Sequence, residues 1–411
     1  MKIAGIIAEY NPFHKGHAWH ARETRRVAGC DYVVACMAGH FTQRGDPACA
    51  SKWARARMAL SCGVDAVFEM PALFAVRSAD AFAQGGVAIL GGLGVDVLCF
   101  GSETDDMELI RTLAALKSDE PKAVSARIRE KLAAGMSHAR ARGEALGEYL
   151  GIPYDEINRP NLALAAEYVR AIAELQSSLR PIAVRRLGGY LEMELGNPVP
   201  ESPGRLCDRQ GSANGEPDGF ASATAIRAAF ERGEVDAALQ AIPEAALPFA
   251  QPDRLHAMDD LLLYRLRGMS PERLAALPES GEGLEHRIYR LCRACATRDE
   301  LLDALKCKRY TRARLSRMLT HALLGIDRQL VEACPLPPYA RLLGMRREAG
   351  PLLRELDRRA NIPIVSAVPA LRDDPCFETE CRATDLWALL HDAPELRRSG
   401  REYLEKFVVV D

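Results

Sequence analysis

The sequence lacks any apolar run long enough to cross a lipid bilayer, and it carries almost no net charge. Its 54 Lys and Arg residues are matched by 56 Asp and Glu residues, so the formal net charge is -2. A membrane-spanning helix needs about 20 consecutive apolar residues, and a protein coated in positive charge needs a clear excess of Lys and Arg. We therefore expect no membrane partner, and any surface for nucleic acid must be local.

The sequence also lacks the cysteine spacing of a disulfide-bonded protein. Its 12 cysteines form no regular framework, and no signal-peptide pattern precedes the first strand-like segment, so we expect reduced thiols and a cytoplasmic location. Cys292, Cys295 and Cys307 have a spacing that a zinc site could use, but the second cysteine pair of a four-ligand site is missing. We interpret these three residues as buried helix thiols and predict no protein metal site.

Length and composition favour a folded chain of two or three domains, because 411 residues that are 48% hydrophobic provide material for more than one core. Apolar runs of strand length alternate with helix-like segments up to residue 186. This alternation predicts an α/β fold with a doubly wound, Rossmann-like parallel sheet, whose ligands bind beyond the carboxyl ends of the strands. The predicted strands are 2–8, 32–37, 66–70, 95–100 and 181–186, with helices starting near 16, 51, 78 and 160.

Other regions have a helical pattern or a loop composition. Residues 107–150 are rich in Ala, Leu, Lys, Arg and Glu without a strand signal, which predicts helices beside the sheet. Gly, Pro, Ser and Asn residues fill 196–219, which predicts a loop or lid. From residue 237 onward the chain is mainly helical in pattern. The predicted elements there are helices at 261–266, 284–295 and 301–324 and short strands at 363–366 and 407–410.

One strand-to-helix turn organises the interpretation of the sequence. Asn11 and Pro12 end the apolar run of the first strand, and a helix-like segment follows from Gly16. Such a turn presents free backbone N–H groups and the positive end of a helix dipole to an anion. His14 and His17 would then bracket a phosphate without carrying a permanent charge. We interpret the turn as a nucleotide site.

Two other interpretations of this turn remain open. His14, His17 and His20 could be metal ligands on one helical face, although Glu9 is the only acidic residue nearby that could complete the shell. The motif His-x-Gly-His is also short enough to recur by chance, and its histidines could simply cap and pack a loop. The context of strand, turn and helix favours the nucleotide site over both.

Two later segments carry groups that suit a polyphosphate. Arg44 lies in the loop after the second predicted strand, so we expect it to converge with His14. Ser222 is a good N-cap for a helix that also contains Thr224 and Arg227, although an ordinary capped helix explains it equally well when it is taken alone. Together with the first turn, this helix start would place hydroxyls and a cation on a leaving pyrophosphate, and histidines near the α-phosphate.

A short stretch of the C-terminal region contains six cations, in a chain whose total charge is near zero. A solvated helix face is the ordinary explanation of such a run. Because Tyr310 lies among the cations and no matching acids follow, an RNA backbone is a fair alternative. The six residues are Lys306, Lys308, Arg309, Arg312, Arg314 and Arg317.

These segments together resemble the bacterial tRNA(Met) cytidine acetate ligases, which contain a nucleotidyltransferase-like domain. The resemblance runs almost from end to end, and its long Glu-Tyr-Asn-Pro-Phe-His motif is far more specific than His-x-Gly-His alone. The matching segments are Glu9-Tyr10-Asn11-Pro12-Phe13-His14-Lys15-Gly16-His17, Phe41-Thr42-Gln43-Arg44-Gly45-Asp46-Pro47-Ala48, Phe100-Gly101-Ser102-Glu103, Pro160-Asn161, Arg185-Arg186, Ser222-Ala223-Thr224-Ala225-Ile226-Arg227 and Lys308-Arg309-Tyr310-Thr311-Arg312.

The resemblance implies a ligase that works in two steps. Acetate attacks the α-phosphate of ATP to give acetyl-adenylate and pyrophosphate, and the N4 amine of the wobble cytidine of elongator tRNA(Met) then takes the acetyl group. ATP with Mg²⁺, acetate and this tRNA are therefore the implied cofactors and partners. An ATP- and acetate-activating domain is implied at 1–235, followed by a mainly helical tRNA-binding region at 236–411.

The resemblance also implies an ATP site, to which we add roles for single residues as hypotheses. His14 and His17 are expected to stabilise charge at the α-phosphate, and Arg44 to assist with phosphate or acetate. The helix start at Ser222, Thr224 and Arg227 is expected to hold the β- and γ-phosphates, and the six cations to bind tRNA. The implied ATP site consists of Ile7, Ala8, Glu9, Tyr10, Asn11, Pro12, Phe13, His14, Lys15, Gly16, His17, Ala18, Trp19, His20, Gly101, Asn161 and Arg186.

Without the resemblance, two other functions compete. An adenylyl- or cytidylyltransferase acting on a small phosphorylated acceptor would use the same turn and sheet, but it would not need a basic C-terminal segment. A nucleotide-sensing or RNA-binding protein with an inactive site is the other candidate, and the intact His14, His17 and Arg227 argue against it. The oligomeric state is left open.

Overall fold

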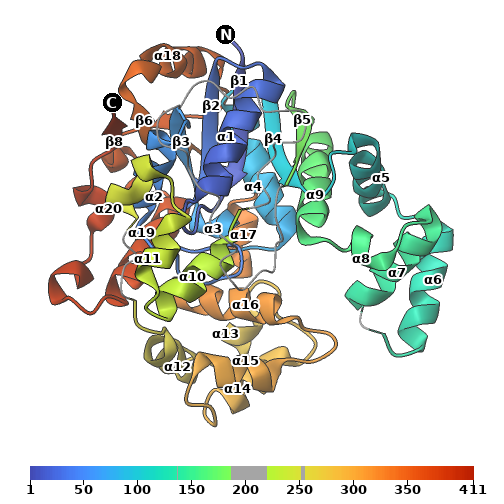
Figure 1. Cartoon of the computed structure of the whole chain (residues 1–411). Helices are drawn as coiled ribbons and strands as arrows, with labels where there is room; N and C mark the ends of the chain where they lie inside the picture. The colour runs from blue at the N-terminus through green and yellow to red at the C-terminus, as the bar shows by residue number, and fades with distance from the viewer. Residues whose placement is uncertain (137, 187–219, 251–254) are drawn as a thin grey trace.

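An eight-stranded sheet forms the centre of the molecule (Figure 1). The computed structural model describes residues 1–136, 138–186, 220–250 and 255–411, so the loop predicted at 196–219 lies outside the described residues. The strand order is β5-β4-β1-β2-β3-β6-β7, and β8 pairs with β6. The strands are β1 Ile3–Ala8, β2 Tyr32–Ala38, β3 Ala66–Met70, β4 Val97–Ser102, β5 Arg180–Arg185, β6 Ala340–Arg346, β7 Ile364–Val365 and β8 Val408–Val410.

The first five strands confirm the predicted doubly wound sheet. β1 pairs in parallel with β2 on one side and with β4 on the other, and β3 and β5 continue the sheet outward, also in parallel. The strand order therefore reverses between β1 and β4. The carboxyl ends of these two strands frame the crevice in which an open α/β sheet binds its ligands.

The C-terminal region adds three strands to the same sheet. β6 pairs antiparallel with β3, and β7 and β8 both pair in parallel with β6. β7 and β8 confirm the predicted tail strands. β6 was not predicted, because the charged Arg341 and the small Gly344 interrupt its apolar pattern. The sheet consequently crosses the domain boundary that the sequence places at residue 235.

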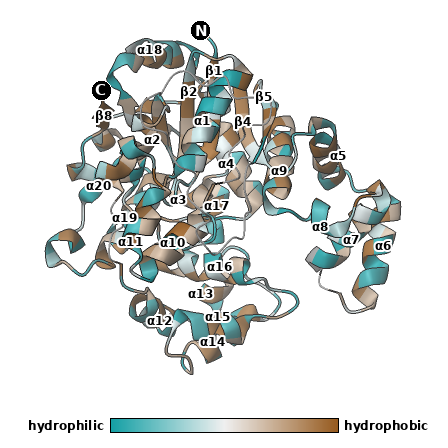
Figure 2. Ribbon diagram, viewed as in Figure 1, coloured by the Kyte–Doolittle hydropathy of each residue, from teal (hydrophilic) through white to brown (hydrophobic). Residues whose placement is uncertain are grey.

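Helices cover both faces of the sheet. Ala4 and Ile6 of β1 pack in one core with α1 and α2, whereas Ile3 packs in another with α4 and α9. This alternation is what a strand buried on both faces requires, and Figure 2 shows hydrophobic residues on the central strands. In the described part of the chain, no helix is both long and apolar enough to cross a membrane. The helices are α1 Lys15–Ala28, α2 Lys52–Ser61, α3 Ala72–Ala75, α4 Ala79–Gly92, α5 Met107–Ser118, α6 Lys122–Ala133, α7 His138–Leu150, α8 Tyr154–Ile157, α9 Pro160–Glu174, α10 Ala223–Glu231, α11 Val235–Gln240, α12 Asp259–Arg267, α13 Pro271–Ala275, α14 Leu284–Leu291, α15 Arg298–Leu305, α16 Arg312–Leu324, α17 Arg328–Ala333, α18 Gly350–Arg359, α19 Pro375–Leu389 and α20 Arg401–Leu404, with short 3-10 helices at Glu244–Phe249, Arg347–Ala349, Val368–Leu371 and Pro394–Arg397.

The helices predicted at 107–150 exist, but only α5 packs against a helix that covers the sheet. α5 packs on α9, whereas α6, α7 and α8 pack on one another. In Figure 1 these three helices form an arm that extends away from the sheet. The expectation that all of this region lies beside the sheet is therefore wrong for α6 and α7.

A helical bundle from α12 to α16 has a hydrophobic core of its own. The single helix predicted at 301–324 is wrong, because the chain breaks between α15 and α16. The hydroxyl of Thr311 accepts the backbone N–H of Arg314 and starts a new helix there. Cys292 and Cys295 are buried as predicted, but Cys307 lies in the break and is exposed.

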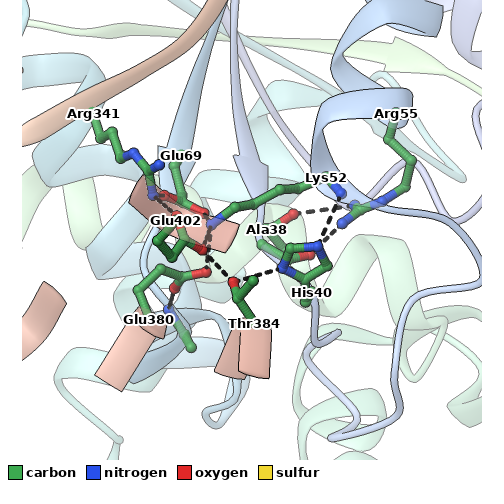
Figure 3. A network of polar contacts seen from close by, with 11 residues as sticks. Ala38, His40, Lys52, Arg55, Glu69, Arg341, Glu380, Thr384 and Glu402 are labelled. Carbon is green, nitrogen blue, oxygen red and sulfur yellow. Dashed lines mark hydrogen bonds and ion pairs between the residues drawn. The ribbon is translucent and has the colours of Figure 1, made fainter. Parts of the chain in front are cut away.

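A buried cluster of charges connects β6, α19 and α20 of the C-terminal region to α2 and β3 (Figure 3). The ammonium group of Lys52 in α2 pairs with Glu380 of α19 at 3.0 Å, with Glu402 of α20 at 2.5 Å, and with Glu69 of β3. Arg341 of β6 pairs with Glu69 at 2.8 Å and with Glu402 at 2.5 Å. All five side chains are buried. Three carboxylates thus share two cations.

Three carboxylates and two cations leave one negative charge unmatched. Burial, and then the neighbouring carboxylate of Glu69, raise the pKa of Glu380. Glu380 is therefore the carboxyl group that takes up a proton most readily in this cluster. Buried charges persist only where such pairing offsets the cost of removing them from water.

Replacing Lys52 with Met should destabilise the protein, because Met fills the space but leaves buried carboxylates without their cation. We expect a loss of about 3–5 kcal/mol in the free energy of unfolding, measured by urea denaturation. The exposed Lys122→Met substitution is the control and should change stability by less than about 0.5 kcal/mol. A Lys52→Met protein as stable as the wild type would contradict this account.

Candidate active site

A cavity of 1420 Å³ opens at the carboxyl ends of β1 and β4, between the N-termini of α1 and α10. Most of the residues predicted for the nucleotide site line it. They are Ile7, Ala8, Glu9, Tyr10, Asn11, His14, Gly16, His17, Trp19, His20, Arg44, Gly101, Asn161, Arg186, Ser222, Thr224 and Arg227.

Four residues predicted for the ATP site do not line this cavity. They are Pro12, Phe13, Lys15 and Ala18. Phe13 is fully buried and packs in the core below the turn, and Ala18 packs against the same core. The backbone N–H of Lys15 donates to the carbonyl of Ala241 at 2.9 Å. Phe13 and Ala18 therefore support the turn from its core side.

His14 and His17 close the first turn of α1 onto itself. The backbone N–H of Gly16 donates to Nδ1 of His14 at 3.1 Å, and the backbone N–H of His14 donates to Nδ1 of His17 at 3.2 Å. The two ring centroids are 3.8 Å apart. The two histidines thus form a capping box, the reciprocal arrangement that Ser and Glu make at other helix starts.

These hydrogen bonds fix the position of the proton on each ring. A ring nitrogen that accepts an N–H bond is not protonated, so a neutral ring carries its proton on Nε2. Burial, and then the charges of Arg186 and Arg227, lower the pKa of His14 to about 3. Burial and the neighbouring His14 lower the pKa of His17 well below its usual value. Both rings are therefore neutral near pH 7, with Nε2–H groups as donors.

The turn before α1 is held in an unusual shape. Tyr10 has a φ of 50°, a left-handed conformation that a bulky residue adopts only where its surroundings enforce it. Its ring lies against Phe13 and His17, each with centroids 4.9 Å away. From below, the guanidinium group of Arg55 donates to the carbonyl oxygens of Glu9 at 2.6 Å and of Ala38 at 3.1 Å.

Arg55 was missed by the sequence analysis, although it is buried beneath the turn and supports it. It is 1% exposed, and its Nε donates to the carbonyl of Ala50 at 3.0 Å while an Nη group donates to that of Gly39. The sequence offers little signal, because α2 also contains Lys52 and Arg57 and Arg55 does not stand out among them. One buried guanidinium group thus donates to carbonyl groups at the ends of both β1 and β2.

The start of α10 forms the opposite wall and contacts the first turn directly. Arg227 donates to the backbone carbonyl of Asn11 at 2.5 Å and to the hydroxyl of Thr224 at 3.3 Å. The hydroxyl of Ser222 accepts the backbone N–H of Ala225 at 3.0 Å and caps the helix. The two helix starts therefore face each other across one cavity, as expected from the sequence.

Residues from three further segments complete the cavity wall. Gly101 is the penultimate residue of β4, and a Cβ atom there would approach the side chain of Arg186 to 3.2 Å, so the glycine keeps room for this cation. Asn161 donates to Glu103 at 2.7 Å, and the same carboxylate accepts the backbone N–H of Leu162 at 2.6 Å. Glu103 therefore anchors the start of α9 beside the cavity.

The six cations at 306–317 do not form one basic helix face, and none of them lines the cavity. Arg317 is buried and pairs with Glu279 at 2.7 Å, and Arg312 pairs with Asp299 and Asp303, each at 2.5 Å. The other four cations are not gathered on one helix face either. Lys306, Lys308 and Arg309 are exposed in the break between α15 and α16, Arg309 pairs with Glu282 at 3.2 Å, and Arg314 donates to the carbonyl of Glu279 at 2.7 Å.

A metal-ligand arrangement occurs elsewhere, away from the histidines of α1. In the described ranges, the one group of side chains with suitable spacing is His40, Glu380 and Glu402, whose ligand atoms lie within 4.8 Å of one another. The ammonium of Lys52 already pairs with both carboxylates. A protein cation therefore takes the place that a metal ion would fill.

Comparison with known proteins agrees with this geometry. The model of the HIGH Nucleotidyl Transferase family matches residues 1–199 and 205–402, which include both walls of the cavity. The tRNA(Met) cytidine acetate ligase of Clostridium perfringens is 34% identical and aligns with 96% of this chain and 97% of its own length. The chain belongs to the tRNA(Met) cytidine acetate ligase family. The ligase of Acetivibrio thermocellus, 32% identical, aligns over 100% of both chains.

Solved structures of this ligase family share the fold. Thermotoga maritima TmcAL bound with alpha-thio ATP is 28% identical, with a TM-score of 0.85 and coverage of 100% of both chains. The apo form of the same protein has a TM-score of 0.86 at 28% identity. The arrangement of sheet, arm and helical bundle is therefore the arrangement of the ligase family.

His14 and His17 should remain neutral, Nε2–H rings over a wide pH range. ¹⁵N NMR of histidine-labelled protein, assigned with His14→Asn and His17→Asn variants, should show this tautomer unchanged from pH 8 to pH 5. The chain unfolded in urea is the control, in which histidines titrate near the ordinary pKa of about 6.5. Protonation of either ring with a midpoint near pH 6 would contradict the proposed hydrogen bonds.

Proposed function

We propose that this chain is an ATP-dependent acetate ligase acting on tRNA(Met). It forms acetyl-adenylate and pyrophosphate from acetate and ATP, and then transfers the acetyl group to N4 of the wobble cytidine of elongator tRNA(Met), giving N4-acetylcytidine. The observation that carries the proposal is the single cavity between two facing helix N-termini in a chain of this ligase family. Because its substrate would be a tRNA, we infer a cytoplasmic location.

The size of the cavity supports a reaction of more than one substrate. Sites for one small molecule usually enclose about 300–1,000 Å³, and this cavity measures 1420 Å³. ATP and a second reactant therefore have room in it together.

The donors of the cavity suit in-line displacement at the α-phosphate. The Nε2–H groups of His14 and His17 would donate hydrogen bonds to the charge that develops there. Both donors are neutral and in position before the reaction begins. Thr224, Arg227 and the start of α10 would hold the leaving pyrophosphate, and Arg44 would orient phosphate or acetate. The hydroxyl of Ser222 already caps α10, so its contribution would be mainly to hold this helix start in shape.

Mg²⁺ would accompany ATP mainly as a phosphate-bound ion. Glu9, Asp46 and Glu231 are the carboxylates along the cavity, and they do not form a group with metal-ligand spacing within the described residues. Mg²⁺ commonly binds through substrate phosphates, water and one or two carboxylates. Its chemistry here would be to neutralise charge on the leaving pyrophosphate.

Acetate-dependent ATP–pyrophosphate exchange tests the first step. The wild type should exchange label only when acetate is present, and His17→Ala should lower the rate by about 100-fold, the usual cost of losing one donor to developing charge. The exposed His286→Ala variant is the control. Exchange without acetate would favour a nucleotidyltransferase with another acceptor, and a wild-type rate for His17→Ala would refute the role of the histidine.

We further propose that the exposed break between α15 and α16 contributes to tRNA binding. Lys306, Lys308 and Arg309 project from this segment, and Lys308 donates to the carbonyl of Gly135 at 3.0 Å, in the turn between α6 and α7. The break therefore meets the arm at this point. These exposed cations could contact an extended phosphate backbone, whereas Arg317 is buried and could not.

Charge reversal tests this surface. Lys306→Glu with Arg309→Glu should weaken tRNA binding and reduce the slope of log K against log salt by about 1 for each lost phosphate contact, while ATP–pyrophosphate exchange is unchanged. The matched control is Arg397→Glu with Lys406→Glu, two exposed cations elsewhere. If exchange falls together with tRNA binding, the segment has a structural role instead.

A further inference from the structure

The second step of the proposed reaction releases a proton. The N4 lone pair of cytidine forms a C–N bond to the acetyl carbon, the C–O bond to the phosphate breaks, and AMP leaves with that electron pair. The amine nitrogen must then lose one hydrogen as a proton, and a positioned side chain usually accepts it. The first step has no such need, because acetate attacks as an anion.

The histidines of the cavity are not placed to accept this proton. His14 and His17 use Nδ1 to accept backbone N–H groups and carry their proton on Nε2, so neither ring offers a lone pair to the cavity. Nε2 of His20 is covered by protein, and burial lowers the pKa of this ring to about 4. His256 is exposed and pairs with Asp392.

In the described ranges three carboxylates line the cavity, and two of them are also unsuitable. Asp46 pairs with Arg298 at 2.8 Å, and its charge is committed to that contact. Glu231 is exposed to solvent at the last residue of α10. Glu9 is the remaining carboxylate among the described residues that line the cavity.

Glu9 is fixed in place at the end of β1. Its Oε1 accepts the backbone N–H of Gln43 at 2.7 Å, and its own carbonyl accepts Arg55 at 2.6 Å. No salt bridge in the described ranges neutralises its carboxylate. Burial raises its pKa above the usual value, although the Gln43 hydrogen bond and the charges of Arg227, Arg44 and Arg55 act in the opposite direction. A carboxylate with a raised pKa is a stronger base.

We propose that Glu9 is the general base that accepts the N4 proton of cytidine during acetyl transfer, an inference that rests on the proposed function. The carboxylate takes the proton as the C–N bond forms, and it returns the proton to water after AMP has left. Glu9 is thus a catalytic residue of the second step alone. Its position on a strand end, next to the helix start that holds the phosphate, brings base and adenylate together.

Separating the two steps tests this assignment. With ATP, acetate and hydroxylamine, acetyl-adenylate is trapped as acetohydroxamate without tRNA. Glu9→Gln keeps the side-chain shape and the acceptor for Gln43, so any loss of acetohydroxamate formation should be small beside the loss of acetyl transfer. Its single-turnover acetylation of tRNA(Met) should fall by about 100-fold, with tRNA binding unchanged. Glu332→Gln, an exposed glutamate of α17 that does not line the cavity, is the matched control and should retain both activities.

The pH profile supplies a second readout. In the wild type, tRNA acetylation should slow as pH falls, because protonation of Glu9 removes the base, and the midpoint should lie above the ordinary glutamate pKa of about 4.3. Glu9→Gln should lack this decline. Acetylation by Glu9→Gln at the wild-type rate, or equal loss of acetohydroxamate and acetylated tRNA, would overturn the role. Absence of acetohydroxamate with the wild type would overturn the proposed function itself, and the role of Glu9 with it.

Discussion

Two buried cations of α2 hold the cavity end of the sheet in place. Lys52 binds carboxylates that belong to α19, α20 and β3, whereas Arg55, one turn later, binds carbonyl oxygens that follow β1 and β2. Neither side chain is more than 1% exposed, so each depends on its partners to offset the loss of water. The same short helix therefore ties the C-terminal region to the turn that carries Glu9.

That support matters because the chemistry of the site depends on fixed, neutral donors. The two histidines at the start of α1 are kept neutral by burial and by nearby guanidinium groups, and their tautomer is set by backbone N–H groups. A donor that is already oriented costs little rearrangement when charge develops on a phosphate. The remaining acid–base function then falls to a carboxylate, and the cavity separates phosphate binding from proton transfer by assigning them to different residue types.

Much of the site could be predicted because its residues fall in a few short contiguous motifs. The turn around His14 and Gly16 and the helix start at Ser222 are local motifs, and local motifs carry their own hydrogen-bonding pattern. The basic stretch shows the limit of this reasoning. Its acidic partners lie elsewhere in the chain, Asp299 in α15 and Glu279 in the turn between α13 and α14, so a run that looks unmatched in sequence is largely paired in the folded chain.

The sequence by itself determined the parallel strands, the strand-to-helix turn and the family, since each depends on periodicity or on short contiguous motifs. Only the tertiary structure decided that β6 extends the first sheet, that Arg55 lies beneath the turn, and that α6 and α7 extend from the body. These features depend on partners far apart along the chain. The sequence pattern indicates which residues prefer burial or a helix. The pairing of buried charges and of strand edges depends on segments that are distant in sequence and come together only in the folded chain.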